Sequence, residues 1–212
     1  MDDDRRLAER LARDPDAAFE AVVAAHQDRC YTIALRMLGD PSDAEEVAQD
    51  ALVRAHRAFT TYEPARVAEL NLRPWLAAIV VNLARNRRRR QSDRQPAVAL
   101  SIPAVEAVVE ARHAAPGDDP QASAERAEDR RELEAALATL TPAIREAVVL
   151  RHVAGLSTIE TAEALGRPEG TIKAQVHRGL ATLRVRMSEP AGPPATLPSP
   201  APTRPAFAGA TR

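Results

Sequence analysis

Apolar residues recur every three or four positions over most of this chain, which is the spacing of helices with one buried face. Three such runs lie in the first part of the chain. The first follows Asp14 and ends at Gly39, the second follows Asp40, and the third follows Pro74 after a polar loop at 60–73. Aspartate followed by proline is typical of a helix start, and glycine is typical of a helix end. The pattern therefore predicts three helices here.

A helix–turn–helix pattern closes the second helical part of the chain. Ser157 and Glu160 have the spacing of a capping box, in which each side chain accepts a bond from the other residue's backbone amide. Gly166 is placed for a left-handed turn after the first helix, and Pro168 suits the start of the second because it has no amide hydrogen to leave unbonded. The predicted apolar stripes of the two helices are Ile159, Ala162 and Leu165, then Ile172, Val176, Leu180 and Leu183.

The outer side of the second helix carries polar and basic residues near its start. This layout is typical of a helix–turn–helix whose second helix enters the major groove of DNA. An ordinary helical hairpin is the alternative interpretation of the same pattern. The residues expected on the outer side are Thr171, Lys173, Ala174, Gln175, His177 and Arg178.

Proline-rich stretches divide the chain into parts. Residues 92–123 hold four prolines, and residues 188–212 hold seven among small residues. Such segments bury too little apolar surface to fold by themselves. We therefore expect an all-α fold of two small helical domains, residues 1–91 and 124–187, joined by a flexible linker at 92–123. The C-terminal domain would hold the helix–turn–helix, and residues 188–212 would form a disordered tail.

The composition favours helices over other fold classes. Hydrophobic residues make up 45% of the 212 residues, but aromatic residues only 3%, and there are only eight glycines. Both β-sandwich and Rossmann folds are poorly supported by this balance. Cys30 is the only cysteine, which excludes an internal disulfide and a cysteine-based zinc site. No group of side chains matches a catalytic constellation, so we expect a non-enzymatic protein with no metal or cofactor.

A net charge of −1 hides a segregation of charge along the chain. Residues 83–94 hold six arginines and one aspartate, and the second helix of the helix–turn–helix is also basic. Residues 40–50 hold five acids and no base. Two basic surfaces and one acidic helix suggest two contacts with DNA and one with a different partner. A solvated helix face is the plainer interpretation of the acidic run.

The sequence carries no visible targeting signal. Its first residues, MDDDRRLAER, are charged and lack the apolar stretch of a secretion signal. No apolar run is long enough to span a membrane. We therefore expect a cytoplasmic protein with no membrane insertion.

Three segments together resemble a known family. They are DPSDAEEVAQDALVRAHRAF, RPWLAAIVVNLARNRRRR and LATLTPAIREAVVLRHVAGLSTIETAEALGRPEGTIKAQVHRGLATLR. In this order and spacing they resemble regions two and four of a bacterial RNA polymerase sigma factor of the small, two-domain extracytoplasmic-function class, which is group 4 of the sigma-70 family. The resemblance covers about residues 14–91 and 131–187.

This resemblance implies a dissociable sigma subunit of RNA polymerase. Such a subunit binds core RNA polymerase, places two domains on two promoter elements and helps to start strand opening, while the polymerase performs the chemistry. The class implies an alternative sigma factor that responds to stress or another signal. It also implies an anti-sigma factor as a possible further partner.

The resemblance also implies three sets of site residues. The acidic helix would dock on core RNA polymerase, the arginine-rich helix and the loop before it would contact the minus-ten element, and the helix–turn–helix would contact the minus-thirty-five element. The docking set is Asp43, Glu46, Gln49, Asp50 and Arg54. The minus-ten set is Tyr62, Asn82, Arg85, Asn86, Arg88 and Arg89. The minus-thirty-five set is Thr171, Lys173, Ala174, Gln175, His177 and Arg178.

Some of these positions depart from the family's usual residues. Asn86 stands where an acid is common, and Ala174 and Gln175 stand where serine and arginine are common. Ala174 offers only its methyl group to a thymine, whereas Gln175 has the groups to pair with adenine. Trp75 is interpreted as a hydrophobic anchor, and Tyr62 is the better candidate for stacking on a base.

Two rival functions stay open at this point. A stand-alone helix–turn–helix regulator would explain the C-terminal motif but neither the arginine-rich helix nor the acidic one, and it would bind DNA tightly without polymerase. A helical enzyme or a protein-only adaptor would tolerate alanine at Lys173 and Arg178, and no motif in the chain supports it.

Overall fold

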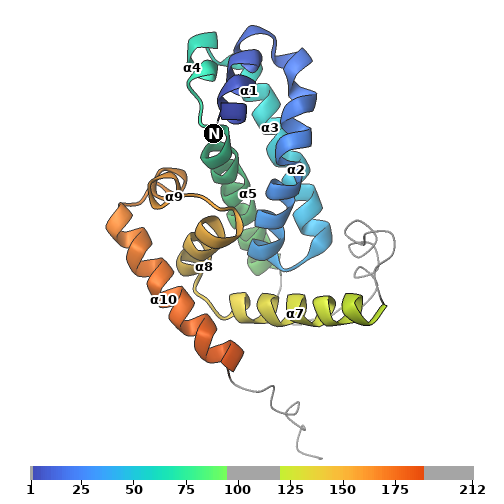
Figure 1. Cartoon of the computed structure of the whole chain (residues 1–212), viewed down its shortest axis with the longest axis vertical. Coiled ribbons are helices and arrows are strands. Elements are labelled where there is room, and N and C mark those ends of the chain that lie inside the picture. The colour runs from blue at the N-terminus through green and yellow to red at the C-terminus, as the bar shows by residue number, and fades with distance from the viewer. Residues whose placement is uncertain (1, 95–119, 189–212) are drawn as a thin grey trace, which may run out of the picture.

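The computed structural model describes residues 2–94 and 120–188, and the regular elements within them are all helices (Figure 1). This confirms the all-α prediction. The middle of the expected linker, 95–119, and the expected tail from 189 onward lie outside the described residues. The helices are α1 (Asp2–Arg13), α2 (Pro15–Leu38), α3 (Pro41–Thr61), α4 (Pro64–Ala68), α5 (Leu72–Arg94), α7 (Pro120–Ala138), α8 (Pro142–Val148), the π-helical η2 (Val149–Val153), α9 (Thr158–Leu165) and α10 (Glu169–Ser188).

Local capping bonds set the starts of α2 and α3, as predicted. The Asp14 carboxylate accepts a hydrogen bond from the Ala17 amide at 3.0 Å, and the Asp40 carboxylate accepts one from the Asp43 amide at 2.8 Å. Gly39 ends α2 with a φ of 77°, a left-handed conformation that glycine adopts without steric cost. These bonds satisfy backbone groups that a helix end would otherwise leave unpaired.

Two helices of the first half lie where the pattern predicts none. Helix α1 is rich in charge, yet Leu7, Ala8 and Leu11 share one side and are buried where it packs against α4 and α2. Helix α4 lies inside the predicted loop at 60–73 and buries Val67. In α1 the apolar positions 7, 8, 11 and 12 have helical spacing, but they occupy only its second half, and the five residues of α4 are too few to show a period. Packing of the two helices against their neighbours buries these few apolar residues.

Helix α5 is longer than predicted at both ends. It begins at Leu72 rather than Pro74, because proline fits within a first helical turn, where its missing amide costs nothing. The Asn71 carbonyl accepts a bond from the Trp75 amide at 3.2 Å. The half-buried Trp75 ring packs against Phe59 with ring centroids 5.2 Å apart, as expected of a hydrophobic anchor. At the other end α5 continues into the predicted linker.

The helix–turn–helix has the predicted caps but not every predicted face. The Ser157 hydroxyl accepts a bond from the Glu160 amide at 3.1 Å, and the Glu160 carboxylate accepts one from the Ser157 amide at 2.7 Å. Gly166 has a φ of 62°. The prediction for Ile159 is wrong, since this residue is 57% exposed. Thr161 is buried instead, and its hydroxyl donates to the Ser157 carbonyl at 2.8 Å.

The two halves of the described chain share one hydrophobic core. Helix α9 packs against α5 (Figure 1), and η2 packs against α2. Arg145 of α8 is buried at this junction and donates to the carbonyls of Leu137 at 2.8 Å, Ala138 at 2.7 Å and Met37 at 3.2 Å. Burial, reinforced by the positive charge of Arg88, lowers the pKa of Arg145 from its ordinary value. One arginine thus joins α8 to the end of α7 and to α2.

The contact between α8 and α10 depends on Gly179. A Cβ atom there would lie 2.4 Å from Cγ2 of Val148 and 2.8 Å from Cγ2 of Ile144. We expect Gly179→Ala to lower the free energy of unfolding by about 1–3 kcal/mol, because the overpacking outweighs the helix propensity of alanine. Urea denaturation measures this loss. Gly170→Ala, whose added Cβ has no atom within 4 Å, is the matched control, and equal stability of both variants would contradict the close approach.

His26 is a buried base without a hydrogen bond. It is only 2% exposed, and neither ring nitrogen has a partner in hydrogen-bonding geometry. Its Nε2 lies 3.4 Å from Oδ1 of Asp4. Burial lowers the pKa of His26, Asp4 opposes this shift, and the positive charges of Arg29 and Arg73 add to it. Folding therefore favours the neutral form of this ring.

This lowered pKa makes stability depend on pH. The unfolded chain takes up a proton near the ordinary histidine pKa of about 6.5, whereas the folded chain does so only at lower pH. The contribution of neutral His26 to the free energy of unfolding is therefore complete above about pH 6.5, and it is lost as the pH falls from there toward the pKa of His26 in the folded protein. We expect wild-type protein to lose more unfolding free energy between about pH 7.5 and about pH 5.5 than His26→Leu does, measured by urea denaturation. Equal losses would show that His26 is not responsible.

Candidate nucleic-acid interface

The outer face of α10 presents a compact group of solvent-exposed side chains. Lys173 lies 3.9 Å from the Glu169 carboxylate, and the Arg178 guanidinium donates to the Ala174 carbonyl at 3.2 Å. Both contacts stay within α10, so neither draws its side chain toward the rest of the molecule. Exposed ion pairs of this kind contribute little stability and are easily exchanged for another partner. The exposed residues of the expected set are Thr171, Lys173, Ala174, His177 and Arg178.

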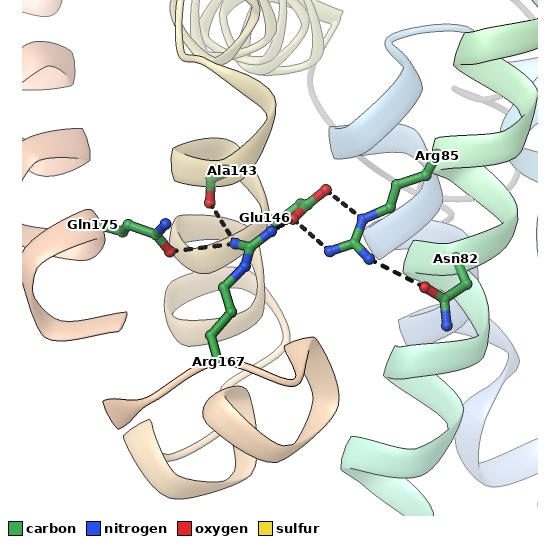
Figure 2. Close-up of polar contacts among 6 residues, drawn as sticks. All are labelled: Asn82, Arg85, Ala143, Glu146, Arg167 and Gln175. Atoms are coloured by element: carbon green, nitrogen blue, oxygen red, sulfur yellow. Dashed lines mark hydrogen bonds and ion pairs between the residues drawn. The ribbon is translucent and has the colours of Figure 1, made fainter. Parts of the chain in front are cut away.

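Gln175 does not belong to this exposed face. It is 9% exposed, and its Oε1 accepts a hydrogen bond from Nη1 of Arg167 at 3.3 Å (Figure 2). Pairing with adenine would need both the oxygen and the nitrogen of its amide group. The expected contact with adenine is therefore not available in this structure. The helical phase turns Gln175 inward, beside the buried Ile172 and Gly179.

The polar side of α5 is divided between solvent and the second half of the chain. Asn82, Asn86 and Arg89 are exposed, and Arg88 is half-buried. Arg85 turns to α8, where Nε and Nη2 donate to the two carboxylate oxygens of Glu146, each at 2.6 Å (Figure 2). Its Nη1 donates to Oδ1 of Asn82 at 3.2 Å. The structure thus brings Asn82 and Arg85 together, but with the arginine already paired.

Glu146 binds arginines from both halves of the chain. Its side chain is 3% exposed, and it also accepts a bond from Nη2 of Arg167 at 2.5 Å (Figure 2). Arg167 in turn donates to the Ala143 carbonyl at 3.0 Å. Burial by itself would raise the pKa of Glu146, but the hydrogen bonds and charges of Arg85 and Arg167 outweigh it and lower the pKa. The bond to Glu146 also raises the pKa of Arg85.

Pattern analysis of the sequence does not identify this cluster. Glu146 directly precedes the apolar run AVVL at 147–150, and a charged residue next to a buried run indicates a partner elsewhere in the fold. The position of Glu146 could therefore have predicted that its carboxylate is paired. It could not have predicted Arg85 as the partner, because Arg85 lies 61 positions away in the chain.

Tyr62 is less open for stacking than expected. Its ring is half-buried, with the guanidinium carbon of Arg66 3.9 Å from the ring centroid. The Trp75 ring lies edge-on to it, at 6.4 Å between centroids. A base could stack on Tyr62 only by displacing Arg66 or by using the opposite face.

The acidic face of α3 has two parts. Asp43 is buried and accepts bonds from Nε of Arg87 at 2.8 Å and from the Gln91 amide, and Arg87 also pairs with Glu46. These contacts tie α3 to the end of α5, and the bond to Asp43 raises the pKa of Arg87. The expectation that Asp43 lies on an open docking surface is wrong, because its carboxylate is used inside the fold. The remaining members of the set, Glu46, Gln49, Asp50 and Arg54, are exposed.

Within residues 2–94 and 120–188, no helix has both the length and the apolar character needed to cross a membrane.

Comparisons with known proteins cover both halves of the chain. The model of Sigma-70 region 2 matches residues 22–94, and the model of Sigma-70, region 4 matches residues 130–183. The RNA polymerase sigma-E factor of Streptomyces coelicolor is 35% identical over 167 residues, which are 78% of this chain and 84% of that protein. The ECF RNA polymerase sigma factor SigE of Mycolicibacterium smegmatis is 32% identical over 169 residues, 79% of this chain, and the chain spans only 60% of that relative's length.

A solved structure shares the fold. It is the co-crystal structure of the sigma factor RpoE in complex with the anti-sigma factor NepR from Bartonella quintana. The TM-score is 0.61 at 22% identity, covering 81% of this chain and 98% of that one. At this identity the likeness supports the arrangement of helices alone.

Proposed function

Because this chain belongs to the sigma-70 family, as an alternative sigma factor of the extracytoplasmic-function class, we propose how its surfaces share the work of promoter recognition. Sigma factors of this family bind core RNA polymerase and promoter DNA. We assign residues 1–91 to the domain for polymerase docking and the minus-ten element, and residues 124–187 to the domain for the minus-thirty-five element. Helix α1 joins the first domain because its apolar side is buried there.

The outer face of α10 reads the minus-thirty-five element. The observation that carries this assignment is the exposure of the basic face of α10 in a helix–turn–helix with both caps in place. Arg178 and Lys173 suit guanine edges or phosphates, and Thr171 lies at the helix start, where backbone amides favour a phosphate. Gln175 supports this face from behind, through Arg167, rather than contacting a base.

The polar side of α5 contacts the opened minus-ten element. Asn82 and Asn86 offer amide groups to base edges. Arg88 and Arg89 follow Asn86 by two and three positions, so they can neutralise phosphates of the same DNA strand. Arg85 joins this set only when its bonds to Glu146 are released. Tyr62 lies before α5 as a stacking surface of lesser weight.

The exposed part of α3 docks on core RNA polymerase. Gln49, Asp50 and Arg54 present charge and amide groups beside Val53, which is 49% exposed and offers an apolar contact. Glu46 belongs to this exposed face as well, while Asp43 acts behind it by holding Arg87 and so fixing α3 on α5. The chain itself performs no chemistry in this assignment, and it works in the cytoplasm. An anti-sigma factor that covers these surfaces is a further partner.

Charge reversal at Arg178 tests the minus-thirty-five assignment. We expect Arg178→Glu to reduce transcription from promoters that need this element by at least the 1–3 kcal/mol of one base contact, roughly 5- to 150-fold, with unchanged binding to core RNA polymerase. In vitro transcription and a core-binding assay measure the two effects. Arg184→Glu, on the same exposed helix, is the control and should cause a smaller loss that does not depend on sequence. Loss of core binding as well would point to a folding role.

Charge reversal at Asp50 tests the docking assignment. We expect Asp50→Arg to weaken binding to core RNA polymerase about 10-fold or more, because a polar contact at an interface is replaced by a misplaced charge. Competition with a labelled sigma factor for core measures the affinity. Glu163→Arg, an exposed acid on α9, is the matched control and should compete as well as wild type. Full competition by Asp50→Arg would remove this face from the docking surface.

A further inference from the structure

The turn of the helix–turn–helix places one arginine between α8 and α10. Gly166 is left-handed, and the backbone amide of the next residue, Arg167, donates to the Ala162 carbonyl at 3.0 Å. This is the bond of a Schellman motif, which fixes the direction in which the chain leaves a helix. The Pro168 carbonyl then accepts a bond from the Thr171 amide at 2.9 Å. The backbone on both sides of Arg167 is thus held by local bonds.

From this turn the Arg167 side chain reaches both helices (Figure 2). Its Nη2 donates to Oε2 of Glu146 at 2.5 Å and its Nη1 to the Ala143 carbonyl at 3.0 Å, and both acceptors lie on α8. The same Nη1 donates to Oε1 of Gln175 on α10 at 3.3 Å. A guanidinium group is planar and its donors point in fixed directions, so it can hold acceptors of two helices in one geometry.

A second contact between α8 and α10 lies one helical turn after Gln175. Gly179 is buried there against the side chains of Ile144 and Val148. Close packing at Gly179 fixes how near α10 lies to α8, but it supplies no directional bond. Hydrogen bonds weaken steeply away from their preferred angle, so the bonds of Arg167 also restrict how α10 is turned.

Gln175 connects these bonds to the exposed face of α10. It lies two positions after Lys173 and three before Arg178. Because all three belong to one helix, a movement of Gln175 relative to α8 carries the two basic side chains with it. Hydrogen bonds to base edges exist only over N···O distances of about 2.7–3.2 Å, so a shift of about 1 Å is enough to lose them.

Removal of the Arg167 guanidinium would not leave Glu146 unpaired. Arg85 donates to both oxygens of the Glu146 carboxylate. The buried charge therefore keeps a cation, and the large destabilisation that follows an uncompensated buried charge is avoided. The Gln175 oxygen, in contrast, loses the bond that ties it to α8. The effect of such a change falls on the placement of α10.

We propose that Arg167 is a positioning residue for promoter recognition: its guanidinium group holds α10 on α8 at the angle at which Lys173 and Arg178 meet the minus-thirty-five element. In this assignment Arg167 does not touch DNA, because its side chain is only 22% exposed and its donors are used by α8 and by Gln175. The inference rests on the proposed role of α10, and it adds that a residue behind the exposed face controls how well the element is read.

Moving the guanidinium group from the turn to α10 tests the proposal. Full-length wild type, Arg167→Ala, Gln175→Arg and the double variant are each combined with core RNA polymerase. The template is a promoter mapped for the wild-type holoenzyme on genomic DNA, with its minus-thirty-five element intact or scrambled. The ratio of specific transcripts from the two templates is the readout. We expect Arg167→Ala to lower this ratio about 10-fold, the size of one lost base contact.

The double variant should recover the ratio to within about threefold of wild type. Gln175 already meets the Arg167 guanidinium at 3.3 Å, so the longer side chain of an arginine at 175 can reach the acceptors on α8 that Arg167→Ala leaves free. Gln175→Arg alone should lower the ratio, because it places two guanidinium groups side by side. A double variant that works better than both single variants is a result that a general loss of folding does not give.

Arg151→Ala is the matched control. It removes a half-buried arginine of the same half of the chain, whose guanidinium donates to the Leu156 carbonyl and not to α10, and it should keep the wild-type ratio. Competition for core RNA polymerase, measured for every variant, should show affinities within twofold of wild type.

Three results would overturn the positioning role. They are an unchanged ratio in Arg167→Ala, a double variant no better than Arg167→Ala, and loss of core binding in Arg167→Ala, which would make the residue a requirement of the fold. A wild-type protein that transcribes equally from the intact and the scrambled template would instead overturn the proposed function of α10, and the role of Arg167 with it.

Discussion

Two opposite charges buried side by side on the short helix α8 organise much of this molecule. A charge taken out of water must be paired or bonded, or it destabilises the fold by several kcal/mol. Arg145 meets this requirement with carbonyls at the end of α7 and on α2. Glu146 meets it with guanidinium groups from α5 and from the turn between α9 and α10. Helices from both halves of the chain therefore converge on α8.

Local signals in the sequence predict the helix ends well. Asp14, Gly39, Ser157 and Gly166 each act on backbone groups within a few residues, so their roles can be recognised from spacing alone. Helices α1 and α4 escape prediction because each has few apolar residues, and these are buried where the two helices pack against each other and where α1 packs against α2. The prediction for Ile159 fails because the buried side of α9 runs through Thr161, Ala162 and Leu165, and Ile159 lies off that side. The hydroxyl of Thr161 is satisfied there by the Ser157 carbonyl.

The candidate site also has some features that local sequence predicts and others that depend on residues distant in the chain. Exposure of Lys173 and Arg178 follows from the period of α10, and the structure agrees. The partners of Asp43 and Arg85 lie 44 and 61 positions away, and no local pattern encodes pairing over such separations. Gln175 lies between these cases, since a rotation of one residue along α10, about 100°, separates an exposed side chain from a buried one. Sequence reasoning therefore identifies the surfaces better than it identifies which of their charges are already in use.

Helix α10 uses different residues for its exposed face and for packing, and this division affects how related sequences can diverge. Lys173 and Arg178 make their polar contacts within their own helix, so replacements at these two positions leave packing intact and can accumulate one at a time. Gln175 and Gly179 belong to the interior, and changes at either must be matched by Arg167 or by α8. Duplicated copies of the gene are thus free to drift apart in the DNA they select while they inherit the same folded body.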